Sequence, residues 1–113
     1  MRYLVKVRKE VWDTFREANN ESGWGVSVNQ RINFWMRDCS LTDVIVNSDV
    51  DTGRLSLGSK PHLFTLTLYD DEIYKEFQNQ CRSHNISVNK ALNLLIREFN
   101  LKGTVCNVYK FKA

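Results

Sequence analysis

The histidines and the clustered acids are the residues of this 113-residue chain whose types suit catalysis or metal binding. Imidazole is a common metal ligand, but His62 and His84 have no cysteine or histidine at ligand spacing. Asp70, Asp71 and Glu72 are consecutive, which is typical of the first turn of a helix, where the helix dipole favours acids. No nucleophile is paired with a base. The sequence therefore predicts a protein that is not an enzyme and that has no cofactor and no metal.

The composition predicts a chain that buries a core and crosses no membrane. Apolar residues make up 42% and aromatic residues 12% of it, and no stretch approaches the ~20 apolar residues of a membrane span. The opening MRYLVKVRKEVW is not a signal peptide, and three cysteines without a CxxC motif fit reduced thiols, so a cytoplasmic protein is expected. The net charge of +3 permits a nucleic-acid partner without requiring one.

Two stretches of the chain repeat each other at a spacing of 60 residues. One reads VSVNQRINFWMRDCSL and the other reads ISVNKALNLLIREFNL. The matched pairs are Ser27 with Ser87, Asn29 with Asn89, Arg37 with Arg97 and Leu41 with Leu101. Serine is a good N-cap and apolar residues follow it at helical spacing, so each stretch predicts a helix.

The same order of elements precedes each repeated stretch. RYLVKVR and FTLTLY alternate in polarity, which predicts strands, and an amphipathic helical pattern follows each of them. Short strands are also expected at 42–47 and 104–111, and Asp-Thr-Gly within 47–58 predicts a turn or hairpin. The predicted divisions are a first unit at 1–41, a linker at 42–61, a second unit at 62–101 and a basic tail at 102–113, all in one intertwined domain.

A single unit of one strand and two short helices is too small to bury a core, and its strand would keep unpaired edges. Two units remove both problems when their strands pair antiparallel and their helices cover one face of the pair. The predicted fold class is therefore α+β, mostly α. It consists of a two-stranded antiparallel ribbon with four helices, plus short extra strands in the linker and the tail.

This order, with Ser-Val-Asn opening the second helix of each unit, resembles the ribbon-helix-helix family of Arc- and MetJ-type repressors. The segment NISVNKALNLLIREF is especially Arc-like, and the resemblance covers about residues 2–39 and 63–99. Members usually form the fold as homodimers, so this chain resembles a tandem, single-chain pseudo-dimer. The resemblance implies a sequence-specific regulator of double-stranded DNA, a repressor from a bacterium, plasmid or phage that is associated with the nucleoid.

The resemblance also implies that outward side chains of the ribbon touch base edges in the major groove. The base-reading residues would be Lys6, Arg8, Thr65 and Thr67, with Arg2, Leu4 and Tyr69 at the margin of the set. Lysine and arginine donate to guanine, and threonine bonds several base edges or places its methyl group on thymine. The second strand is uncharged, where family members commonly carry a basic or amide residue. Unlike strands predict an asymmetric DNA site.

The start of each second helix is the other DNA contact that the resemblance implies. Free backbone amides and the positive end of the helix dipole favour a phosphate there. The phosphate-binding residues would be Ser27, Val28 and Asn29 in the first unit and Ser87, Val88 and Asn89 in the second. Taken alone, a serine at a helix start is more often a plain N-cap.

The charges favour DNA binding only in the first unit and the tail. Residues 1–39 carry seven basic and five acidic residues, whereas residues 62–101 carry four basic and five acidic. We therefore expect modest affinity from one molecule and self-association through the strands expected at 42–47 and 104–111. A protein-binding module on the same fold, an antitoxin-like or phage-encoded inhibitor of a host protein, is the alternative. Trp12, Trp24 and Tyr74 would be its exposed aromatic residues, although Trp12 equally fits the core.

Overall fold

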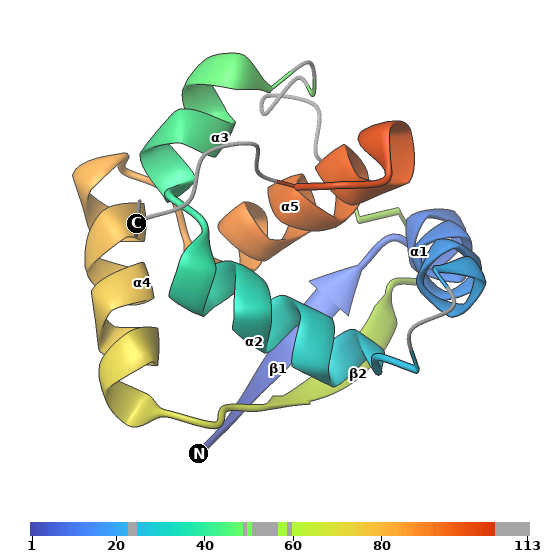
Figure 1. The fold of residues 1–113 in the computed structure, drawn as a ribbon, viewed down its shortest axis with the longest axis horizontal. Helices are drawn as coiled ribbons and strands as arrows, with labels where there is room; N and C mark the ends of the chain where they lie inside the picture. Colours follow the sequence, from blue (N-terminus) through green and yellow to red (C-terminus); the bar gives the residue numbers. More distant parts are fainter. Residues whose placement is uncertain (23–24, 49, 51–56, 59, 106–113) are drawn as a thin grey trace.

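The computed structural model describes residues 1–22, 25–48, 50, 57–58 and 60–105. Its elements, in chain order, are β1 (Arg2–Val7), α1 (Lys9–Glu21), α2 (Val28–Asp38), α3 (Leu41–Asn47), β2 (His62–Thr67), α4 (Asp71–Ser83) and α5 (Val88–Lys102). Figure 1 shows α2 and α5 between α4 and α1, with the two strands on one side of them and α3 on the other. The order strand, helix, helix occurs twice, and α3 is inserted between the two occurrences.

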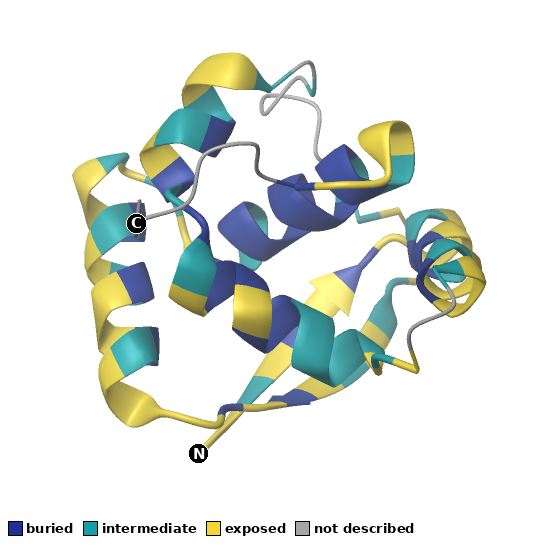
Figure 2. Cartoon of the chain, viewed as in Figure 1, coloured by how far each residue is buried: buried dark blue, intermediate teal, exposed yellow. Residues whose placement is uncertain are grey.

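The two strands pair antiparallel and form the ribbon. Val5 and Val7 of β1 and Leu66 of β2 are fully buried beneath the helices. The residues between them on each strand are exposed, as the alternating burial colours of the strands in Figure 2 show. The alternation of RYLVKV and FTLT therefore divides the ribbon into a buried face and an open face, as the sequence predicts.

The second helix of each unit begins at its predicted serine. Ser27 and Gln30 form a capping box, in which Ser27 Oγ accepts from the Gln30 N–H at 3.1 Å and Gln30 Oε1 accepts from the Ser27 N–H at 2.9 Å. Ser87 Oγ accepts from the Lys90 N–H at 3.1 Å. Asp70 caps α4 by accepting from two backbone N–H groups of the first turn. These caps fix where three helices start relative to the ribbon.

Three aromatic rings join α1, α2 and α5 in the core. The ring centroids of Phe15 and Trp35 are 5.6 Å apart, and Phe99 lies 5.7 Å from each of them. The guanidinium of Arg31 covers the Phe99 ring at 4.6 Å from its centroid. Trp12 is buried on α1, so the core interpretation of this residue is correct. One core thus spans both halves of the chain.

The predicted fold class is wrong, because the described residues form five helices and the segment expected as a strand at 42–47 belongs to α3. Ser40 is the N-cap of α3 and accepts from the Asp43 N–H at 3.4 Å. Leu41 and Val44, three residues apart, are buried on one face of this helix. The β-branched residues of LTDVIVN suggested a strand, but the cap and the i, i+3 burial favour a helix.

Contacts from α4 also hold α3, and no local pattern reveals them. The Leu41 N–H donates to Gln80 Oε1 at 3.0 Å, and Thr42 Oγ1 lies 2.8 Å from His84 Nε2. Among the described residues β1 and β2 are the only strands, so the extra strands of the prediction are not present there. The strand expected at 104–111 and the hairpin expected at 47–58 lie largely outside the described residues.

The histidine and cysteine side chains that the structure describes do not form a cluster. His62 stacks on the Trp12 ring with centroids 4.5 Å apart. Cys81 is a free thiol whose burial raises its pKa to about 11, whereas Cys39 is disulfide-bonded, so the expectation of reduced thiols is wrong for Cys39. In the described part of the chain no three metal-ligating side chains gather, and no helix is long and apolar enough to cross a membrane.

Candidate nucleic-acid interface

The open face of the ribbon carries six exposed side chains in three cross-strand pairs. The pairs are Arg2 with Thr67, Leu4 with Thr65, and Lys6 with Leu63. Five of these residues were predicted from the sequence as base-reading or marginal DNA contacts. The face therefore presents two cations, two hydroxyl groups and two leucines on one surface, without an acid.

Leu63 is the residue of this face that the sequence prediction missed. It is 55% exposed, and it lies next to Lys6 across the ribbon. The alternation of FTLTLY extends one residue further back to Leu63, which gives the outward position. An apolar side chain at the start of a strand gives no sequence signal for a surface contact.

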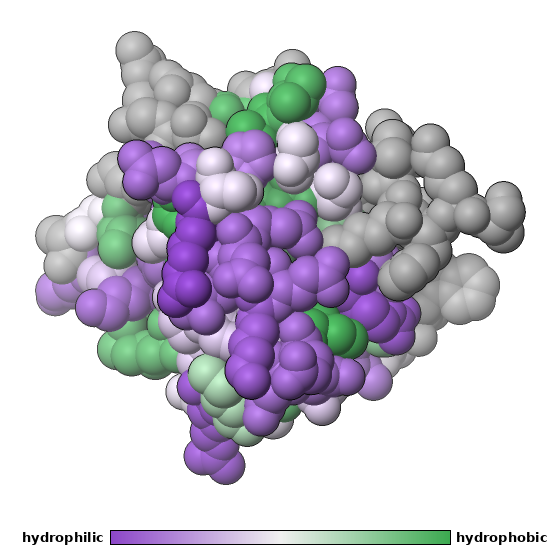
Figure 3. All heavy atoms as spheres, turned by 90° about the vertical axis from the view of Figure 1, so that its left-hand side faces the viewer, coloured by the Kyte–Doolittle hydropathy of each residue, from purple (hydrophilic) through white to green (hydrophobic). Residues whose placement is uncertain are grey.

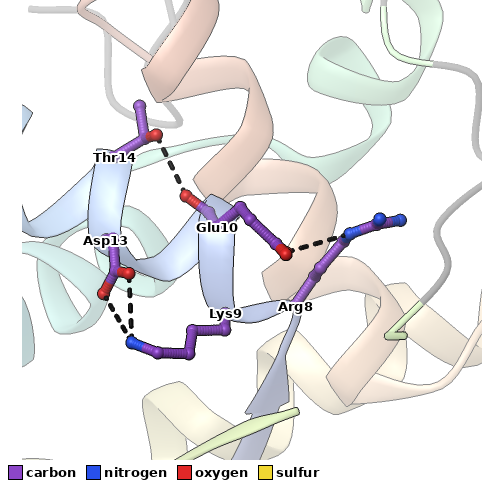
Figure 4. Close-up of polar contacts among 5 residues, drawn as sticks. All are labelled: Arg8, Lys9, Glu10, Asp13 and Thr14. Carbon is purple, nitrogen blue, oxygen red and sulfur yellow. Dashed lines mark hydrogen bonds and ion pairs between the residues drawn. The ribbon is translucent and has the colours of Figure 1, made fainter. Parts of the chain in front are cut away.

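Arg8 lies outside the ribbon face, because β1 ends at Val7 and Arg8 is the N-cap residue of α1. Arg8 Nε pairs with Glu10 Oε2 at 3.1 Å, and Figure 4 shows the guanidinium beside Glu10 at the start of α1. The stem of the arginine lies beside Gly58 of the linker. The predicted base-reading pair Lys6 and Arg8 is thus divided between the ribbon and the first turn of a helix.

Local electrostatics at the start of α1 follow from this arrangement. The pKa of Glu10 is lowered, first by its own backbone N–H in the first turn and then by Arg8. Burial lowers the pKa of Arg97 on α5, and the positive charge of Arg8 lowers it further. Arg8 therefore interacts electrostatically with Glu10 of α1 and with Arg97 of α5.

Tyr69 follows the end of β2 and is exposed beside a hollow on α2. Its backbone N–H donates to Asn33 Oδ1 at 3.1 Å. We call this hollow of about 320 Å³ the Phe34 pocket, lined by Asn33, Phe34, Arg37, Tyr69, Asp70 and Ile73. The Arg37 guanidinium lies 5.1 Å from the centroid of the Phe34 ring. Tyr69 thus belongs to the rim of this pocket as well as to the end of the ribbon.

Two asparagine side chains bind the outer edges of the ribbon. Asn89 of α5 accepts from the Lys6 N–H at 2.8 Å and donates to the Lys6 carbonyl at 3.2 Å. Asn29 of α2 accepts from the Thr67 N–H at 2.8 Å and donates to the Thr67 carbonyl at 3.1 Å. We call these paired contacts the asparagine clamps. Each replaces the neighbouring strand that an edge residue lacks.

A second asparagine, one helical turn along, reinforces each clamp. Asn33 Nδ2 donates to the Thr67 carbonyl at 2.9 Å, and Asn93 Nδ2 donates to the Lys6 carbonyl at 2.8 Å. Both side chains are buried. In each case the helix of one unit holds the strand of the other unit, so the two units are intertwined.

The clamps place the two predicted phosphate sites beside the ribbon. Because Asn29 binds Thr67 and Asn89 binds Lys6, α2 begins at the outer edge of β2 and α5 begins at the outer edge of β1. Thr67 and Lys6 are near opposite ends of the antiparallel pair, so the two helix starts flank it diagonally. The Asn29 and Asn89 side chains are occupied by the ribbon, and the backbone N–H groups of the first turn are the groups that suit an anion.

The other residues predicted for phosphate binding share this first turn. Val28 and Val88 are the first residues of α2 and α5. Ser27 and Ser87 accept a backbone hydrogen bond as caps, and their hydroxyl hydrogens still donate. The geometry therefore allows each serine to be both an N-cap and a phosphate contact.

Comparison with known proteins identifies no relative: no family model, no curated protein and no solved structure matches this chain.

Proposed function

We propose that this chain is a sequence-specific, double-stranded DNA-binding transcriptional regulator, a repressor, whose ribbon enters the major groove. The observation that carries the proposal is the open ribbon face, where six exposed side chains include Arg2 and Lys6 and no acid. The proposal makes the chain a tandem ribbon-helix-helix protein. It acts as a binding protein without catalysis, in the nucleoid of a bacterial or phage-infected cell.

The dimensions and chemistry of the ribbon support insertion into the groove. The major groove of B-DNA is about 12 Å wide and admits a two-stranded ribbon, whose strands lie about 4.8 Å apart. Arginine and lysine donate to guanine, and threonine meets several base edges. The donors on Arg2, Lys6 and Thr67 all project from the same face.

The diagonal helix starts support contact with both backbones of one duplex. A ribbon in the groove has a phosphate backbone on either side of it, and α2 and α5 begin at the two outer edges of this ribbon. Their first-turn N–H groups and dipoles favour a phosphate oxygen. The clamps hold both starts in a fixed position relative to the base-reading side chains.

Salt-dependent fluorescence anisotropy on a pool of labelled duplexes tests the proposal. We expect binding whose logarithm falls linearly with the logarithm of the salt concentration, because binding releases counterions from phosphates. Arg2→Ala and Lys6→Ala should each weaken the binding and, where the side chain meets a phosphate, reduce the salt slope by about one. Both side chains are exposed, so circular dichroism should show an unchanged fold.

The matched control is Lys75→Ala, which removes an exposed lysine from α4, away from the ribbon. It changes the net charge as much as Lys6→Ala does, so equal losses from the two variants would indicate a nonspecific charge effect. Absence of binding at low salt by a folded wild-type protein would refute the proposal. Arg8→Ala removes a cation at the start of α1, where Arg8 is paired with Glu10. Comparing this variant with Lys6→Ala distinguishes a DNA contact of the ribbon from a DNA contact at the start of α1.

A protein-binding module, an antitoxin-like or phage-encoded inhibitor of a host protein, is the second candidate. The observation that favours it is the Phe34 pocket, where Phe34 is 39% exposed beside Tyr69. Of the aromatic residues expected to be exposed, Trp12 and Tyr74 are buried, and Trp24 lies outside the described residues. The surface on the α4 side is mostly hydrophilic, with separate apolar areas (Figure 3). If the chain binds a protein partner through this pocket, Phe34→Ala should abolish binding to that partner and Lys6→Ala should preserve it.

A further inference from the structure

Two exposed leucines occupy the centre and one end of the ribbon face. Leu4 is 49% and Leu63 is 55% exposed, and they lie on a diagonal across the two strands, because Leu4 pairs with Thr65 and Leu63 pairs with Lys6. Diagonal neighbours in a sheet are within reach of long side chains. Together with the methyl group of Thr65 they form one apolar strip, which we call the leucine strip.

Single exposed leucines are common, but this strip lies on the surface that the proposed function places against DNA. In the major groove the C5-methyl group of thymine is the apolar feature among the base edges. A leucine that covers a G·C edge would instead remove water from the guanine oxygen and the cytosine amine and offer neither a partner. The strip therefore discriminates in favour of A·T pairs.

We infer that the leucine strip recognises thymine methyl groups, so that the ribbon selects A·T pairs beneath Leu4 at its centre and beneath Leu63 toward one end, together with guanines near Arg2 and Lys6. The inference rests on the proposed DNA-binding function. Arg2 and Lys6, four residues apart on β1, lie on either side of Leu4 and supply the guanine contacts. Four residues of a strand span about 13 Å, which corresponds to about four base pairs.

The same arrangement makes the site directional. Exchanging the two strands about the central Leu4–Thr65 pair relates Arg2 to Leu63 and Lys6 to Thr67, the two residues that the asparagine clamps bind. Each cation on β1 therefore matches an uncharged residue on β2. Both guanine donors therefore come from one strand of the ribbon. Turning the DNA site by 180° about its two-fold axis would place the two guanines against Leu63 and Thr67.

Thymine-to-uracil replacement tests the inference, because it removes only the methyl group. The wild-type protein first selects its preferred duplex from a random pool, and each thymine of that duplex is then replaced singly. Anisotropy should show a loss of roughly fourfold in affinity at each contacted thymine. Leu4→Ala or Leu63→Ala should remove the difference between thymine and uracil at the position that each leucine contacts. The control Leu101→Ala, which truncates a 65% exposed leucine of α5, should retain the difference.

The outcomes separate the inference from the function on which it rests. Specific binding that is indifferent to uracil at every position would overturn the methyl recognition and leave the DNA-binding function standing. A uracil effect that persists in both leucine variants would also overturn it. If the folded wild-type protein binds no duplex, both the function and the inference fail.

Discussion

The asparagine clamps give a prediction whose size can be worked out from the structure. Asn29→Ala deletes two hydrogen bonds to the backbone of Thr67, at 2.8 and 3.1 Å, and Asn89→Ala deletes the equivalent pair to Lys6, at 2.8 and 3.2 Å. A hydrogen bond contributes about 1 kcal/mol net, so each variant should lose about 2 kcal/mol of unfolding free energy. For a chain of this length that corresponds to a decrease in Tm of about 8 °C.

Thermal unfolding and amide hydrogen exchange measure the global and the local effect. The local effect should be specific: the Thr67 amide exchanges faster in Asn29→Ala, and the Lys6 amide exchanges faster in Asn89→Ala. Asn79→Ala is the control. Asn79 is exposed on α4, so this substitution makes the same chemical change outside the ribbon.

Two results would refute the clamp. One is a decrease in Tm no larger than that of the control variant. The other is amide exchange at Thr67 and Lys6 that is unchanged in both variants, since the amides would then not depend on Asn29 and Asn89. Loss of DNA binding alone, without a change in either measurement, would assign the asparagines to the DNA contact and not to the ribbon.

Three further predictions concern stability. Arg31→Ala should lose about 2 kcal/mol, measured by urea denaturation, because it leaves the buried Asn19 amide oxygen without its donor; Arg31→Lys should recover only part of this loss. Burial raises the pKa of Cys81 from 9.0 to about 11. The contribution of this thiol to the free energy of unfolding should therefore be fully present below pH 9 and be lost between pH 9 and 11, and Cys81→Ala should show a smaller decrease over that range. Asp70→Ala should lose about 1 kcal/mol in thermal unfolding by removing the α4 cap, whereas the neighbouring Asp71→Ala should change little.

The parts of the fold that local chemistry determines were predictable from the sequence. The period of two in RYLVKV identified the buried and exposed faces of β1, and the serines before Val28 and Val88 identified the starts of α2 and α5. The same local argument failed at α3, where β-branched residues outweighed the weaker signal of Ser40 as a cap. It also failed at Arg8, because alternation does not reveal that the strand ends one residue earlier.

The clamps could not be predicted, because their partners are distant in sequence. Asn29 binds Thr67, 38 residues away, and Asn89 binds Lys6, 83 residues away. A helix that starts with Ser-Val-Asn is explained by its cap alone, so the repeat gave no reason to assign the asparagine side chain to a strand. The relevant signal was the repetition of asparagine at two further positions, Asn33 and Asn93, which lie one turn beyond and face the same edges.

The exchange of clamps between the units fixes the ribbon and the two helix starts relative to each other. α2 holds β2 and α5 holds β1, so neither strand keeps its edge partner unless both units are folded together. The ribbon face and the two helix starts are consequently positioned by the same hydrogen bonds, four from the clamps and two from the asparagines that reinforce them. A substitution at a clamp should therefore weaken base reading and phosphate contact together, whereas a substitution at Lys6 or Ser87 should weaken only one of them. Comparing the site preference and the salt slope of these variants distinguishes a coupled surface from two independent ones.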